Sequence, residues 1–147
     1  LYNILSQFQN DFYTPNLKCL NRSLYQNRAL YSKDVLFLHD KQEMKCDVIT
    51  CAAPNYKAAH RFQGVTAQEN FTVLDSRIKF IIDIAEEQQV ETLILGAFGC
   101  GVFGQDPREV TKLFRKHLHK TTYTHNVIFA IPNSNNANYF IFKRIFQ

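Results

Sequence analysis

Two stretches of the chain place apolar side chains at the spacing of one helix face. In the first, Thr66 and Glu69 form a capping-box pattern, and the periodic residues that follow predict an amphipathic helix ending near Gln89. The second has Asp106 as its N-cap and Pro107 at the first helical position. The residues expected to face the core are Phe71, Leu74, Ile78, Ile81, Ile82 and Ala85 in the first helix, and Val110, Leu113, Phe114 and Leu118 in the second.

Short apolar runs bounded by turn-forming residues predict strands. The run 47–53 (DVITCAA) is apolar on both faces, which is typical of a buried central strand. Because strands alternate with helices, we expect parallel pairing with helices on both faces of the sheet, and an α/β fold class. No repeat or linker divides the chain, so residues 1–147 are interpreted as a single domain. The remaining predicted strands are 35–38, 91–97 and 126–131, with short helices at 4–8 and 139–146.

The composition is that of a soluble globular protein, with 46% hydrophobic and 20% charged residues. No apolar run approaches the roughly 18 to 20 residues of a membrane span, so no membrane association is expected. The four cysteines show no regular framework, which favours free thiols and a cytoplasmic location. From Pro107 onward there are seven basic residues and one acid, Glu109. This basic half either faces an anionic partner or is a solvated helix surface.

The stretch GAFGCGVFGQDP, residues 96–107, holds four of the five glycines and spells G-x-G-x-x-G over 99–104. Backbone amides of such a loop, together with the free N–H groups of the following helix, attract a phosphate or diphosphate, and Phe103 can lie against a sugar. A dinucleotide-binding site needs an acid roughly 20 residues further on. No acid follows Glu109, which disfavours a dinucleotide-binding site. A second alternative to phosphate binding is a tight glycine-rich turn without a ligand.

Other candidate chemistry in the sequence is weak. Cys100 precedes a helix N-terminus, where a reactive thiolate can form, but a small residue filling a crowded turn is the favoured interpretation. His117 and His119 are two positions apart on a helix and therefore point in different directions. No metal site is predicted.

Several blocks of the sequence together resemble a known family. The segment LILGAFGCGVFGQDPREVTKLF closely resembles the glycine-rich signature of microbial-type poly(ADP-ribose) glycohydrolases, a branch of the macrodomain fold. Residues 31–40 (YSKDVLFLHD) and 47–55 (DVITCAAPN) resemble two further blocks of that family in the same order. Arg77 also lies where the family often has arginine.

The resemblance implies a three-layer α/β/α sandwich around a mixed, mostly parallel sheet, with ADP-ribose as ligand. Phe103 would pack on the distal ribose. The strand ends at Pro54 and Asn55, and at Pro132 and Asn133, would border the cleft. The implied partners are ADP-ribose, poly(ADP-ribose) or an ADP-ribosylated protein, with no cofactor and no direct nucleic-acid contact. The residues whose backbone would hold the diphosphate are Gly99, Cys100, Gly101, Val102, Phe103 and Gly104.

The sequence departs from the family at the catalytic element, a triple-glycine loop followed by Gln-Glu-Glu that precedes these blocks. Residues 1–147 contain no Gly-Gly pair, and Gln68-Glu69 is better explained by the capping box. We therefore assign no catalytic residue and keep three hypotheses. In the first, the chain is part of a glycohydrolase that cleaves the ribose–ribose O-glycosidic bond with a general acid upstream of Leu1. In the second, it is a reader of ADP-ribose that lacks the acid. In the third, it is a domain that binds nothing without that upstream segment.

Overall fold

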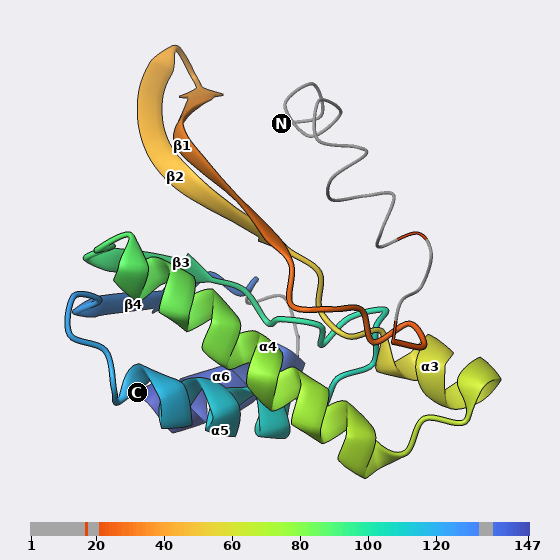
Figure 1. Ribbon diagram of the computed structural model, residues 1–147. Helices are drawn as coiled ribbons and strands as arrows, with labels where there is room; N and C mark the ends of the chain where they lie inside the picture. The colour runs from red at the N-terminus through yellow and green to blue at the C-terminus, as the bar shows by residue number, and fades with distance from the viewer. Residues whose placement is uncertain (1–16, 18–20, 133–136) are drawn as a thin grey trace.

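The computed structural model describes residue 17 and residues 21–132 and 137–147 (Figure 1). The expected helix at 4–8 lies outside the described residues. No described helix is long and apolar enough to cross a membrane. The elements are β1 (Ala29–His39), β2 (Gln42–Cys51), α3 (Tyr56–Gln63), α4 (Ala67–Glu87), β3 (Thr92–Leu95), α5 (Pro107–Leu118), β4 (Asn126–Phe129) and α6 (Ala137–Phe146).

The strands form two pairs of opposite type. β1 and β2 are an antiparallel hairpin, whereas β3 and β4 are parallel, with Thr92 opposite Asn126 and Leu95 opposite Phe129. The expectation of parallel pairing is wrong for the hairpin, because only Asp40 and Lys41 separate its strands. Both residues have positive φ, as a two-residue hairpin turn requires. The predicted α/β class with mixed strand pairing is confirmed.

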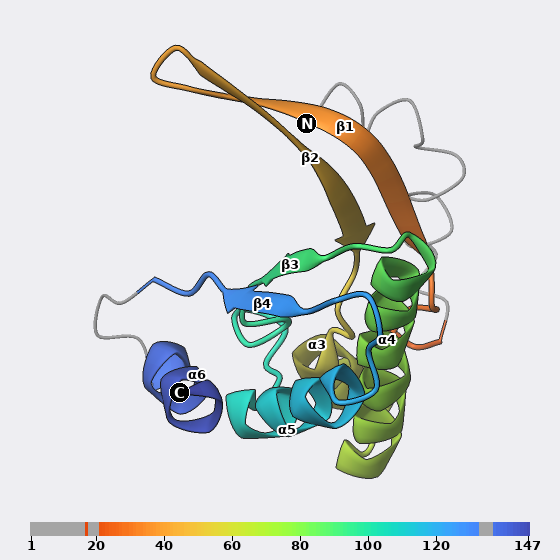
Figure 2. The same cartoon turned by 90° about the vertical axis from the view of Figure 1, so that its left-hand side faces the viewer.

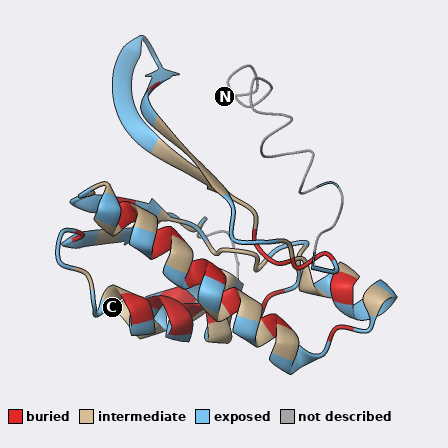
Figure 3. Ribbon diagram, viewed as in Figure 1, coloured by how far each residue is buried: buried red, intermediate tan, exposed pale blue. Residues whose placement is uncertain are grey.

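Packing of α4, α5 and α6 against β3 and β4 forms the main core (Figures 1 and 2). The described helices lie on one side of the strand pair, and their facing surfaces are buried (Figure 3). Phe129 of β4 stacks on Phe146 of α6 with ring centroids 4.4 Å apart. The other face of the pair is open, since Ile94 and its register partner Ile128 remain 64% and 52% exposed.

Both predicted helix starts are confirmed. At the start of α4, the Thr66 side chain accepts a hydrogen bond from the Glu69 amide, and the Glu69 carboxylate accepts one from the Thr66 amide. At the start of α5, Asp106 is the N-cap and Pro107 lies in the first turn. Most of the predicted core-facing residues are buried; Phe71 and Leu118 are partly buried against the same core.

Two predictions about the first half of the chain fail. β1 runs over Ala29–His39 rather than 35–38, and no residue of β2 is fully buried, although its apolar run was expected to form a buried central strand. Sequence reasoning also missed α3, which begins at the N-cap Asn55 and ends at Gly64 in the left-handed conformation. An Asn followed nine residues later by Gly was the available signal.

Arg77 ties three distant parts of the chain together. Its side chain is fully buried, and its guanidinium donates to the Asn27 Oδ1 at 2.7 Å, to the Leu24 carbonyl at 3.3 Å and to the Ala52 carbonyl. Burial lowers its pKa from the usual value. A cation removed from water is tolerated here because three oxygens accept its N–H groups.

We expect Arg77→Met to lower the free energy of unfolding by about 2 to 4 kcal/mol, because it leaves buried carbonyls without donors. Lys79→Met, two positions along the same helix, is the control: this lysine is exposed and, among the described residues, forms an ion pair only with Asp83. Urea denaturation of both variants measures the difference. Equal stabilities would contradict the anchoring role of Arg77.

Candidate functional site

A buried pair of side-chain amides fixes the glycine loop to the end of β2. Gln105 is 3% exposed and donates from Nε2 to the Pro54 carbonyl at 2.8 Å. Its amide also exchanges two hydrogen bonds of 2.9 Å with the amide of buried Asn70 on α4. The loop that follows β3 and the loop that follows β2 are therefore held together at the carboxyl ends of these two strands.

The glycines of the loop have different roles. Gly99 has φ +72°, and a Cβ there would lie 2.7 Å from the Gln105 side chain and 3.0 Å from Ala53. Gly104 has φ +74°, and a Cβ would approach Lys57 to 3.1 Å. Nothing lies within 4 Å of a Cβ built on Gly101. Two glycines thus allow the loop to fold and pack, while the middle one faces open space.

Three successive backbone amides of the loop are available to a ligand. Within the described residues, the N–H groups of Gly101, Val102 and Phe103 donate to no protein acceptor. The neighbouring amides of Cys100, Gly104 and Gln105 are used inside the loop, bonding Ala97, Gly101 and Gly99 carbonyls. Successive free N–H groups on a glycine loop form a concave site for an anion.

Phe103 connects this loop to two other segments. Its carbonyl accepts from the Lys57 amide at 3.0 Å at the start of α3. Its ring lies 6.5 Å from that of Tyr25, at 49°. Val102 beside it is 83% exposed. The loop is thus fixed at its base and open at its tip.

The expectation that the following helix adds free amides to the anion site is wrong. The Asp106 carboxylate accepts from the Arg108 amide at 2.8 Å, and its carbonyl accepts from Glu109 and Val110. The N-terminus of α5 is therefore occupied by a carboxylate of its own chain, which also repels a second anion. Between the start of the loop and the first turn of α5, the run of three free amides in the described residues is that of the loop, at Gly101, Val102 and Phe103.

The other predicted site residues are placed as follows. Pro54 is buried, with its carbonyl bonded to Gln105, and Asn55 caps α3 by accepting from the Ala58 amide at 3.2 Å. Both lie beside the loop through the Gln105 and Lys57 contacts. Asn133 lies outside the described residues. Lys57, Asn70 and Gln105 were not predicted, because only the fold brings them together.

Cys100 packs rather than reacts. Its side chain lies against the core, and burial together with the nearby Asp106 charge raises the pKa of the thiol to about 12. The thiol is therefore protonated at neutral pH. This supports the interpretation of Cys100 as a small residue filling the turn.

Glu69 is not a candidate proton donor. Its hydrogen bonds from Thr66 and its contact with Arg22 lower the pKa of its carboxyl to about 2. It is therefore ionised at neutral pH, and its oxygens serve the helix cap. The interpretation of Gln68-Glu69 as a capping motif is supported.

The histidine and basic side chains of α5 either pair with a carboxylate of α4 or are exposed to solvent. His117 is buried and its Nε2 lies 2.6 Å from the Asp75 carboxylate on α4, which also pairs with Lys116. Among the described residues, no three His, Cys, Asp or Glu side chains are grouped to hold a metal. The remaining basic residues of α5, at 108, 112 and 115, are exposed.

No family model and no curated protein sequence matches this chain. Solved structures do match it. Poly(ADP-ribose) glycohydrolase from Thermomonospora curvata, bound to the inhibitor ADP-HPD, aligns with a TM-score of 0.85 at 26% identity, covering 98% of this chain and 57% of that chain. The enzyme from Deinococcus radiodurans in complex with ADP-ribose gives 0.81 at 26% identity, covering 90% and 57%.

This chain has the fold of the bacterial poly(ADP-ribose) glycohydrolases. The apo form of the Deinococcus radiodurans glycohydrolase also matches, with a TM-score of 0.80 at 26% identity over 90% of this chain and 58% of that chain. The chain thus spans a little more than half the length of these glycohydrolases. The resemblance found in the glycine block and its two companion blocks is confirmed by the fold.

The glycines of the loop give a stability test. Gly99→Ala should lower the free energy of unfolding by about 2 kcal/mol or more, because it adds a clash to a left-handed backbone. Gly101→Ala should change it by less than about 0.5 kcal/mol, as expected for an open surface position. Thermal unfolding of both variants checks this. The reverse order would show that Gly101, not Gly99, is the packed glycine.

Thiol reactivity tests the environment of Cys100. At pH 8, iodoacetamide should alkylate exposed Cys46 well before Cys100, because a thiol with a pKa of about 12 is almost fully protonated there. Mass spectrometry of proteolytic peptides at timed intervals measures both rates in one sample. Faster labelling of Cys100 would restore the thiolate interpretation.

Proposed function

We propose that residues 1–147 form an ADP-ribose-binding domain of the poly(ADP-ribose) glycohydrolase type. The observation that carries the proposal is the run of free amides at Gly101–Phe103, on a loop anchored at its base by Gln105. A chain of the same fold was solved with ADP-ribose, and another with an inhibitor. A diphosphate carries the negative charge that such amides attract.

In this proposal the backbone of 99–104 holds the diphosphate. Open space at Gly101 lets the phosphates approach the main chain closely, and partly buried Phe103 offers its ring to the distal ribose. Pro54 and Asn55 lie beside the loop through the Gln105 and Lys57 contacts, and Asn133, outside the described residues, is proposed as a further contact of the ligand. The ligand is ADP-ribose itself, an end of poly(ADP-ribose) or an ADP-ribosylated protein.

Hydrolysis of the ribose–ribose bond needs a group that protonates the departing oxygen. Glu69 does not supply it, since its pKa is lowered to about 2 and its carboxylate caps α4. We assign no catalytic residue within residues 1–147, so glycohydrolase activity in the whole protein requires an acid from another segment. The described cysteines are free thiols, which suits a reducing compartment such as the cytoplasm.

Calorimetry with ADP-ribose tests the binding proposal. Gly101→Val should weaken binding by at least about 100-fold, equivalent to about 2.7 kcal/mol, because its side chain occupies the space in front of the amides. Phe103→Ala should cost about 1 to 3 kcal/mol, the scale of one lost stacking contact. Both variants should keep the unliganded fold, checked by circular dichroism.

Arg115→Ala is the control on the exposed face of α5, and it should change affinity only slightly and in a salt-dependent way. An equal loss for Arg115→Ala and Gly101→Val would place the site on the basic helix and exclude the loop. Absence of heat at millimolar ADP-ribose with an intact fold would overturn the proposal. Binding of NAD in preference to ADP-ribose would favour the dinucleotide alternative.

A further inference from the structure

The helix layer carries a row of exposed cations. Arg108, Lys112 and Arg115 lie on α5 at positions i, i+4 and i+7, so about one helical turn separates each from the next. α6 packs beside α5 (Figures 1 and 2) and adds exposed Lys143 and Arg144. We call the surface formed by these five side chains the basic face.

Helix geometry turns the basic face away from the strands. Phe114 of α5 and Phe142 of α6 both contact the ring of Phe129 on β4, with ring centroids 5.5 Å and 5.1 Å apart. Residues two positions apart on a helix point about 200° apart around its axis. Lys112 and Arg144 are each two positions from one of these phenylalanines, so they point away from β4. The basic face is therefore the side of the helix layer opposite to the strands.

The cations of the basic face have no carboxylate partner in the described part of the chain. None of the five forms an ion pair there, whereas Lys116 of the same helix pairs with Asp75 of α4 at 2.7 Å. Glu86, near the other end of α4, accepts instead from the backbone amides of residues 122–124. The α4 carboxylates in contact with α5 and the loop after it are thus already used. The positive charge of the basic face is left for an external anion.

An exposed aromatic ring lies on the same side of α6. Phe140 is 57% exposed and, like Arg144, is two positions from Phe142, so both point outward. Its ring packs edge-on against that of Tyr139, with centroids 5.5 Å apart, which helps to hold it in place. Cations that follow a phosphate backbone, together with a ring on which a base stacks, are the pattern by which proteins bind single-stranded nucleic acid. A duplex offers its phosphates but keeps its bases stacked on one another.

We propose that the basic face binds single-stranded nucleic acid, with phosphates along the cations of α5 and α6 and a base stacked on Phe140. This departs from the family resemblance, which implies no direct nucleic-acid contact. The end of α5 nearest the glycine loop carries two carboxylates, Asp106 and Glu109. An ADP-ribose polymer held at the loop would pass these like charges before it reached the basic face. The basic face is therefore a second site, independent of ADP-ribose binding.

The probe is a fluorescein-labelled oligothymidylate of about 12 nucleotides, titrated with the full 147-residue chain and followed by anisotropy between about 50 and 200 mM NaCl. Binding should be saturable. The logarithm of the association constant should fall against the logarithm of the salt concentration with a slope of about −3.5, since each of five cations on a phosphate contributes about −0.7. Lys112→Gln should weaken binding and make this slope shallower by about 0.7, and Lys112→Arg should preserve both. Phe140→Ala should weaken binding at least about fivefold without changing the slope, because it removes a stacking contact and no charge.

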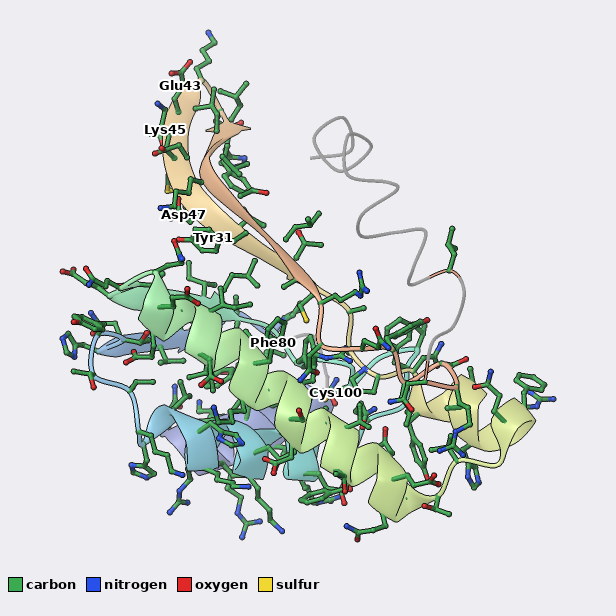
Figure 4. All side chains as sticks on the ribbon, in the orientation of Figure 1. Tyr31, Glu43, Lys45, Asp47, Phe80 and Cys100 are labelled. Carbon is green, nitrogen blue, oxygen red and sulfur yellow. The ribbon has the colours of Figure 1, made fainter. Side chains whose placement is uncertain are left out.

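Lys45→Gln is the matched control, because it removes the same charge from an exposed lysine on the hairpin, at the opposite end of the molecule from α5 (Figure 4). It should change the affinity less than about twofold and leave the salt slope unchanged. Equal effects of Lys45→Gln and Lys112→Gln would overturn the proposal. So would the absence of binding at the lowest salt concentration, with the fold shown intact by circular dichroism.

Two other ligands and one loop variant separate the remaining outcomes. Tighter binding of a duplex of the same length would exclude the single-stranded ligand. Stronger binding of oligo(ADP-ribose) that Lys112→Gln weakens would assign the basic face to that polymer and overturn the proposal. Gly101→Val should leave oligothymidylate binding unchanged, since the glycine loop lies outside the basic face. An equal loss for Gly101→Val and Lys112→Gln would place the oligonucleotide at the loop.

Discussion

The hydrogen bonds of one buried amide hold the candidate site in place. Gln105 joins the end of the glycine loop to the Pro54 carbonyl and to Asn70 on α4, with little access to water. In such surroundings a polar group without a hydrogen-bond partner lowers the stability of the fold, so the three groups fix one another's positions. The tip of the loop can then expose its amides without losing its shape, because its base is held from two directions.

The sequence predicted the parts of this arrangement that depend on local patterns. The caps at Thr66 and Asp106 and the periodic residues of α4 and α5 are local signals, and the structure contains both helices as expected. The glycine block was recognised from its spacing and its resemblance to a family. The close packing of Gly99 and the open space at Gly101 were not predictable, since they depend on the distance to Gln105 and Ala53 in the folded chain.

The failed predictions share a physical cause. Burial of β2 and the pairing of the first strands depend on what lies beside them, which a pattern of apolar residues does not specify. The prediction of free amides at the α5 N-terminus failed for a related reason. Asp106, which makes a good N-cap, itself accepts the hydrogen bonds of the amides that a phosphate would need. A strong local signal for structure was here a signal against ligand binding at the same place.

Arg77 has a consequence for the order in which the chain folds. Its three acceptors lie 25, 50 and 53 residues earlier in the sequence. During synthesis the segment 24–27 and the hairpin emerge before Arg77 exists, so their anchor forms only after the first half of α4 has left the ribosome. The hairpin closes through a two-residue turn, so its own strand pairing is local, whereas its attachment to Arg77 through Ala52 spans 25 residues. The hairpin can therefore complete its own strand pairing before Arg77 fixes it to α4.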